Sequence, residues 1–248
     1  MGKWFKFSAG FIGVYLMFLL ILMPANIVLQ WISLPNRLQL GTVSGSIWHS
    51  QIEIVKYENL VVNNADIKLS AFSLLLLDPQ LDVSFGGALV SGPEGQVTIN
   101  GLLTDAPRLN DGNMSLRANS ITPYLNLPLE VTAHDFIDIT LDEFVVGKAI
   151  CQKLSGKVDW QKAAVTVLEQ KVNLGKLTTN LSCQQGDVIL TLDEKNDLGL
   201  SFSASVGQGF STKGSGYLTP NNNTPAAIQQ VLPFLGKPDN QGRYRLRF

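Results

Sequence analysis

The chain has 248 residues, which is room for one large domain or two small ones. Its 19 Lys and Arg residues against 20 Asp and Glu residues give a formal net charge of -1, so the basic excess of a nucleic-acid-binding protein is missing. Charged residues make up 16% of the chain, below the roughly 25% of an average soluble domain, which indicates apolar sequence outside a soluble core. With two His and two Cys residues, the side chains of most zinc and general acid-base sites are scarce. We therefore expect no enzymatic activity, no cofactor and no bound metal.

The first long feature is a stretch without charged side chains over residues 7–36, with large apolar residues concentrated between Phe11 and Met23. Its length and composition predict a transmembrane helix. Trp4 and Trp31 flank the stretch, and in helical geometry they would lie about 40 Å apart, close to the bilayer thickness including both headgroup layers. We therefore expect both indoles in the interfacial belts.

Positive charge before this stretch predicts its orientation. Lys3 and Lys6 lie in the N-terminal tail, so the positive-inside rule places that tail in the cytoplasm. A cleaved signal peptide is the alternative, but no Ala-x-Ala pattern follows the apolar run. We therefore divide the chain into a tail and membrane anchor at 1–36 and an external β-rich domain at 37–248.

Beyond residue 37, apolar and polar residues alternate with a period of two, which predicts half-buried strands. The expected strands include 67–71, 81–85, 114–118, 137–142, 188–192 and 198–206. Turn residues, for example at 110–112 and 184–187, separate strands about ten residues apart, which favours an antiparallel meander. At most one short helix is expected, over 226–235, with Thr224 as its N-cap.

A weak echo between residues 43–48 and 154–160 leaves a duplication open, in which two similar halves would meet near residue 145. Chance similarity is the alternative, because a Gly-x-Val-x-Trp pattern is common in β proteins.

The two cysteines, Cys151 and Cys183, form an even pair in a domain that we place outside an inner membrane, where thiols are oxidised. We therefore predict a structural disulfide between them, with two free buried thiols as the alternative. No Cys-x-x-Cys motif supports a redox role.

Few other residues suggest chemistry. His49 and His134 have no His or Cys neighbours at metal-ligand spacing, and we interpret both as ordinary strand or surface residues. Near the C-terminus, Arg243, Arg245 and Arg247 alternate with apolar residues. They are interpreted either as charges that protect an edge strand or as a contact for an anion or a partner.

The order and spacing of several short motifs carry a resemblance over nearly the whole chain. These motifs are Met23-Pro24-Ala25-Asn26, then Val43-Ser44-Gly45-Ser46-Ile47-Trp48, then Cys151, Leu154, Gly156, Val158 and Trp160, then Cys183 with Gly186, and finally Gly236-Lys237-Pro238-Asp239 with Gly242-Arg243-Tyr244. In this succession the chain resembles the type II secretion system protein N family.

The resemblance implies a single-pass inner-membrane accessory component of the type II secretion system, with a periplasmic domain and no enzymatic activity. It implies contacts with the lipid bilayer and with other secretion components, either the inner-membrane platform or the secretin. It also implies an extended, curved antiparallel sheet similar to AsmA-like envelope proteins. The alternative function is a lipid-handling envelope protein with an apolar β-groove.

Overall fold

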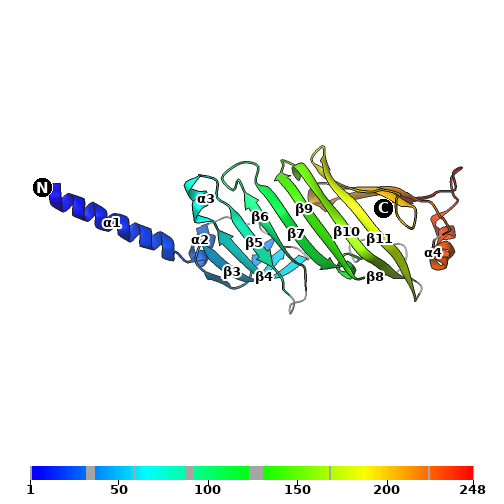
Figure 1. Ribbon diagram of the computed structural model, residues 1–248, viewed down its shortest axis with the longest axis horizontal. Coiled ribbons are helices and arrows are strands. Elements are labelled where there is room, and N and C mark those ends of the chain that lie inside the picture. Colours follow the sequence, from blue (N-terminus) through cyan, green and yellow to red (C-terminus); the bar gives the residue numbers. More distant parts are fainter. Residues whose placement is uncertain are drawn as a thin grey trace. The chain divides into compact units, whose positions relative to one another are not determined.

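The computed structural model describes residues 2–31, 37–57, 60–87, 92–122, 131–167, 169–222 and 224–247. The protein is mainly antiparallel β-sheet, as predicted (Figure 1). The chain forms two compact units, residues 1–94 and 95–248. Residue 145, where two similar halves were expected to meet, lies inside the second unit. It is near the end of a strand that pairs with the next strand along the chain.

The N-terminal apolar stretch is not one continuous helix. Helix α1 spans Gly2–Leu22, and a separate helix α2 spans Ala25–Trp31. Pro24 lies between them, and because proline lacks an amide hydrogen and disfavours helical backbone in the residue before it, the helix stops here. The expectation of a single helix from Trp4 to Trp31 is therefore wrong. Residues 32–36 lie outside the described part of the chain.

None of the helices that the structure describes is both long enough and apolar enough to cross a membrane.

Within its described residues, the first unit holds five antiparallel strands, in which β1, β3, β4 and β5 follow one another and β2 also pairs with β3. Its strands are β1 (Leu38–Leu40), β2 (Val43–Gly45), β3 (His49–Tyr57), β4 (Leu60–Leu69) and β5 (Leu81–Phe85). The strand predicted over 67–71 ends at Leu69, because Ser70 caps a short helix α3, Ala71–Leu75, by accepting a hydrogen bond from the Ser73 amide.

The second unit is a meander. Its strands are β6 (Glu94–Asn100), β7 (Arg108–Arg117), β8 (Val131–His134), β9 (Phe136–Val146), β10 (Cys151–Val167), β11 (Gln170–Gln184), β12 (Asp187–Leu192), β13 (Leu200–Val206), β14 (Thr212–Leu218) and β15 (Tyr244–Arg247). From β9 to β15 each strand pairs with its successor, while β7 pairs with β9 and β8 adds to β10. The longest hairpin is β10–β11.

Helices are more numerous than predicted, and all of those beyond α1 are short. Besides α2 and α3, the chain forms α4 (Ala226–Val231) and the 3₁₀ turns η1 (Ala118–Ser120), η3 (Gln208–Phe210) and η4 (Leu232–Leu235). The expectation of at most one short helix is therefore wrong. The helix predicted over 226–235 becomes a 3₁₀ turn from Leu232, next to Pro233. The predicted N-cap of this helix, Thr224, is wrong: the N-cap of α4 is Pro225. The Thr224 hydroxyl instead accepts a hydrogen bond from the Asn221 amide.

The core of the second unit has two apolar clusters. The larger packs Ala163, Val172, Leu174, Leu198, Leu218 and Leu232 together, with Ile228 of α4 and Tyr244 and Leu246 of β15 against it. The smaller packs Ala118, Ala133 and Ile137. Helix α4 and the last strand are thus held to the meander by burial of apolar side chains.

Candidate functional site

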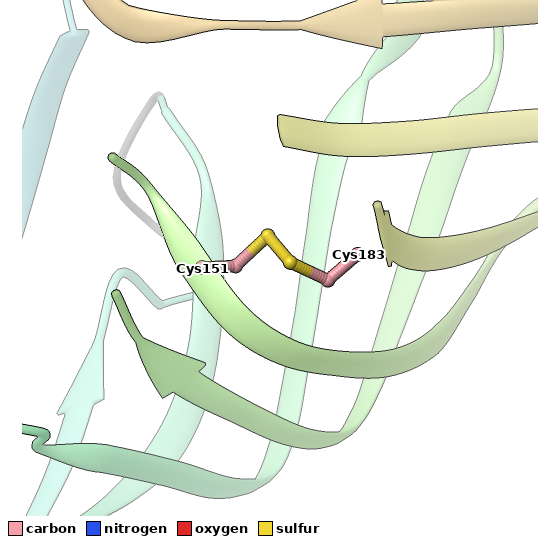
Figure 2. Close-up of a disulfide and its surroundings, with 2 residues drawn as sticks. All are labelled: Cys151 and Cys183. Carbon is pink, nitrogen blue, oxygen red and sulfur yellow. A yellow bond between two sulfur atoms is a disulfide. The ribbon is translucent and has the colours of Figure 1, made fainter. Parts of the chain in front are cut away.

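The predicted disulfide joins Cys151 to Cys183, with a Cα–Cα distance of 6.1 Å (Figure 2). Cys151 begins β10 and Cys183 lies near the end of β11, so the bond closes the open end of the longest hairpin. Backbone hydrogen bonds from the amides of Ile150 and Cys151 to the Gly186 carbonyl lie beside it. Cys151 is 3% exposed, so this covalent link is a structural clamp.

The three C-terminal arginines are not equivalent. Arg243 forms a tight contact with Asp239: its Nε donates to Oδ2 at 2.9 Å, and its backbone amide donates to Oδ1 at 3.0 Å. Its guanidinium also lies over the Tyr217 ring, 4.3 Å from the centroid. The hydrogen bond from the Arg243 amide is the main cause that lowers the pKa of Asp239. Arg243 therefore fixes the turn that leads into β15.

Arg245 and Arg247 instead point to solvent from β15, and the structure gives neither an ion pair within the described residues. Across from them on β14 lie Tyr217 and Ser215, followed on β13 by Ser201 and Ser203. No charged side chain occupies these four positions. The predicted arginine group is thus divided into one structural residue and two exposed cations on a basic strand edge.

A second site, which the sequence did not reveal, is the junction between α1 and the first sheet. The Trp48 indole N–H donates to the Leu20 carbonyl at 3.0 Å, and the Ile47 amide donates to the Met23 carbonyl at 3.0 Å. Leu20 lies in the last turn of α1, where helix carbonyls lack partners within the helix, and Met23 directly follows the helix. Pro24 also forms an isolated bridge with Ser46. These contacts fix α1 to the turn before β3.

The turn at this junction requires glycine. Gly45 has φ +89°, and a Cβ atom there would lie 2.3 Å from the His49 carbonyl oxygen. The motifs at 23–26 and 43–48 are therefore two sides of one contact. The signal that could have linked them was the Gly-x-x-Trp spacing next to a helix-ending proline, but nothing in the sequence specifies that they meet.

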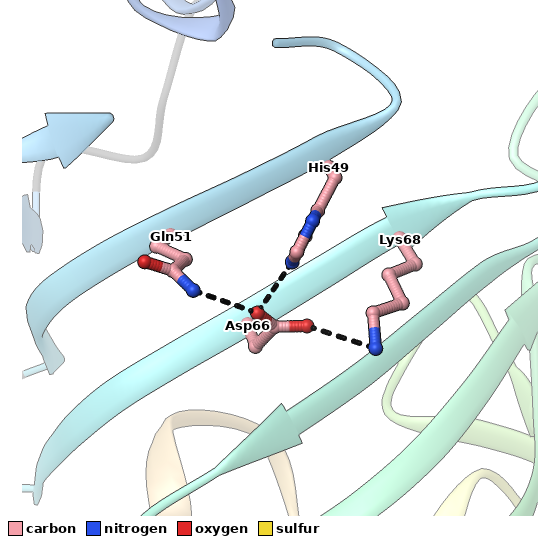
Figure 3. Close-up of polar contacts among 4 residues, drawn as sticks. All are labelled: His49, Gln51, Asp66 and Lys68. Atoms are coloured by element: carbon pink, nitrogen blue, oxygen red, sulfur yellow. Dashed lines mark hydrogen bonds and ion pairs between the residues drawn. The ribbon is translucent and has the colours of Figure 1, made fainter. Parts of the chain in front are cut away.

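The histidines lie in different units, each with its own partners. His49 Nε2 lies 2.7 Å from Asp66 Oδ2, Gln51 donates to the same oxygen, and Lys68 Nζ lies 3.5 Å from Oδ1 (Figure 3). These residues face one another across β3 and β4. The hydrogen bond from His49 is the main cause that lowers the pKa of Asp66. The cluster is a cross-strand polar contact on the sheet surface.

His134 is part of the packing of the second unit. Its Nε2 lies 2.7 Å from the Thr166 hydroxyl, and its carbonyl accepts from the Trp160 indole. Among the residues that the structure describes, no group of three or more His, Cys, Asp or Glu side chains could hold a metal ion.

The predicted membrane-interface residues lie at the two ends of the helical region. The backbone of Lys3, Trp4 and Lys6 belongs to α1, but their side chains lie outside the described part of the chain. Trp31 ends α2 and is 72% exposed. Large apolar side chains from Phe11 to Leu22 are also exposed on α1.

The fold defines a mainly antiparallel β protein with one disulfide among its described residues and an exposed basic last strand. A family model described as "Type II secretion system (T2SS), protein N" matches residues 36–247. The chain therefore belongs to the type II secretion system protein N family, as its motifs indicated, and is a component of that system.

Curated relatives with the same family name match this chain over most of their length. The chain is similar to type II secretion system protein N of Aeromonas hydrophila, with 29% identity over 97% of this chain and 96% of the relative. The protein of the same name from Vibrio cholerae is 24% identical over 90% of this chain and 88% of the relative. The protein of the same name from Pectobacterium carotovorum is 24% identical over 94% of this chain and 92% of the relative. No solved structure matches significantly, so the expected likeness to AsmA-like proteins is unsupported.

Proposed function

We propose that this chain is an inner-membrane accessory component that helps assemble or brace the type II secretion apparatus and so supports export of folded proteins across the outer membrane. Membership of the protein N family carries the proposal. Enzymatic activity and a cofactor have no part in it. The chain acts by tethering: its N-terminal region attaches to the bilayer, and its strand edges and polar faces contact other secretion components.

Two observations support attachment of the N-terminal region to the inner membrane and a periplasmic location of the β domain. Exposed apolar side chains surround the described part of α1, from Phe11 to Leu22, and such a surface is costly in water. The Cys151–Cys183 disulfide in the second unit is typical of an oxidising compartment, which the periplasm is. In this proposal the N-terminus is cytoplasmic, and Lys3, Trp4, Lys6 and Trp31 lie at the membrane interfaces.

The junction at Trp48 gives the tether its mechanical continuity. Because the hydrogen bonds to Leu20 and Met23 join the end of α1 to the turn before β3, a force on α1 is transmitted to the first sheet. The partners proposed are the inner-membrane platform or the secretin. The lipid-handling alternative has no support from the relatives, all of which are secretion proteins by name.

A deletion strain tests the function. Secreted proteins should accumulate in the periplasm when the chain is absent, and expression of the chain should restore export. Outer-membrane lipid composition, measured in the same cells, should stay unchanged. Unchanged export together with altered lipid composition would reject the secretion role in favour of lipid handling.

Fractionation tests the location. The full chain should resist alkaline extraction from inner membranes, and protease added to spheroplasts should cleave its C-terminal domain. A chain protected from protease in spheroplasts would contradict the topology.

A further inference from the structure

The last strand, β15, closes the strand order of the second unit and has β14 as its neighbour on one side. Within the described residues no strand pairs with its other side, so alternate backbone amides and carbonyls along that edge remain available for another strand. An edge of this kind binds an extended segment by main-chain hydrogen bonds, and its side chains select the segment.

The edge is held in place before any partner binds. The bidentate contact between Asp239 and Arg243 fixes the turn that enters β15, and Arg243 is held over Tyr217 of β14. On the inner face, Tyr244 and Leu246 pack against the larger apolar cluster. A preformed edge reduces the ordering cost of association.

The two faces of β15 differ in chemistry. Arg245 and Arg247 are exposed on one face without an ion pair, and exposed Lys213 lies two residues from Ser215, the partner of Arg247, on the same face of β14. The opposite face continues the apolar cluster through Tyr244 and Leu246. A strand added here places its residues alternately against guanidinium groups and beside apolar side chains.

From this geometry we infer that the outer edge of β15 receives an extended acidic segment of a different protein, with carboxylates on alternate residues opposite Arg245 and Arg247 and apolar residues between them. A second copy of this chain is disfavoured at this edge, because pairing β15 with itself places arginines opposite arginines. That the segment belongs to another secretion component rests on the proposed function, whereas the chemistry of the edge does not.

The test uses the full chain in mild detergent and a fluorescent peptide of alternating valine and glutamate. Anisotropy should show binding to the natural chain that weakens with salt. The double substitution Arg245→Gln and Arg247→Gln should weaken it about tenfold or more, since two cross-strand charge pairs are lost. The control pair Lys157→Gln and Lys162→Gln, two exposed cations on β10, should leave binding unchanged.

Two further arms identify strand addition. Two N-methylated versions of the peptide are compared, each with the amide hydrogens of one of its two strand edges blocked. The peptide blocked on the edge that faces β15 should lose its affinity, and the peptide blocked on the other edge should keep it. A charge-reversed chain, with Arg245→Glu and Arg247→Glu, should bind an alternating valine and lysine peptide instead, which also shows that the substituted chain is folded.

Equal binding of both methylated peptides, or no effect of the arginine substitutions, would overturn the inference. So would self-association of the Arg→Gln chain without any peptide binding to the natural chain, because the arginines would then be protective charges only. If the edge fails while the chain still supports export, the inference alone fails. If the edge binds but deletion leaves export intact, the proposed function alone fails.

Discussion

The two units of this protein are stabilised in different ways. In the first unit the described buried apolar residues are Ala25, Ile52, Ala65 and Pro79, and cohesion depends on sheet pairing and surface polar contacts such as that of His49 with Asp66. The second unit has two apolar clusters and a disulfide. The difference indicates that apolar packing contributes more to the stability of the second unit than to that of the first.

The largest expected effect concerns the disulfide. Replacing both Cys151 and Cys183 by serine should lower the free energy of opening of β10–β11 by about 3.7 kcal/mol, the chain-entropy value for a loop of this length. Hydrogen exchange should show the loss there and leave β3–β4 unchanged. The natural chain under reducing conditions is the control and should behave alike. An equal loss in both units would contradict the view that the two units are stabilised in different ways.

A core truncation should come next. Leu174→Ala removes a buried side chain from the larger cluster, and we expect a loss of about 2–3 kcal/mol in denaturant unfolding of the second unit. The matched change Leu60→Ala in the first unit, where the residue is 54% exposed, should cost less than about 0.5 kcal/mol. Similar costs for the two variants would mean that the units are not packed differently.

The junction offers a smaller effect. Trp48→Phe keeps an aromatic ring but removes the N–H that donates to the Leu20 carbonyl, so we expect a loss of about 1 kcal/mol in local stability. Exchange of the Ile47 amide, which donates to Met23, should become faster. The exposed Trp31→Phe change is the control. Unaltered exchange at Ile47 would show that the indole does not hold the junction.

The smallest effect is a titration. Because the hydrogen bond from His49 is the main cause that lowers the pKa of Asp66, His49→Ala should raise that pKa toward its ordinary value, as measured by NMR. Because the pKa of Asp66 is lowered in the folded chain, its contacts stabilise the fold at pH values above the ordinary aspartate pKa. This stabilisation is lost as the pH falls through the pKa of Asp66 in the folded chain. Gln51→Ala should produce a smaller rise. A pKa that does not move would place His49 outside the cluster.

Much of the sheet could be predicted because alternation is a local signal. Strand 81–85 matches its predicted bounds, and the turn around Gln185 and Gly186, both with positive φ, was marked by its residue types. The turn predicted at 110–112 is wrong, because β7 continues through Asp111, which takes a positive φ within the strand. Pairing with β9 there overrides the local turn signal.

Sites were harder to predict than strands because they depend on residues that meet in space. The disulfide followed from compartment and count alone. The different roles of the three arginines could not be predicted from the sequence. The positions of Tyr217 and Asp239 in the fold decide that Arg243 is the arginine with intramolecular partners. The Trp48 junction joins segments that sequence spacing does not connect.

The central claim is that this chain acts through protein contacts within the secretion apparatus. Its most direct test is mild crosslinking in native membranes, affinity purification of the chain in mild detergent, and mass spectrometry of both proteins and lipids. The account predicts recovery of the secretin or of inner-membrane secretion components well above a control membrane protein. Stoichiometric lipid without any secretion component would contradict it.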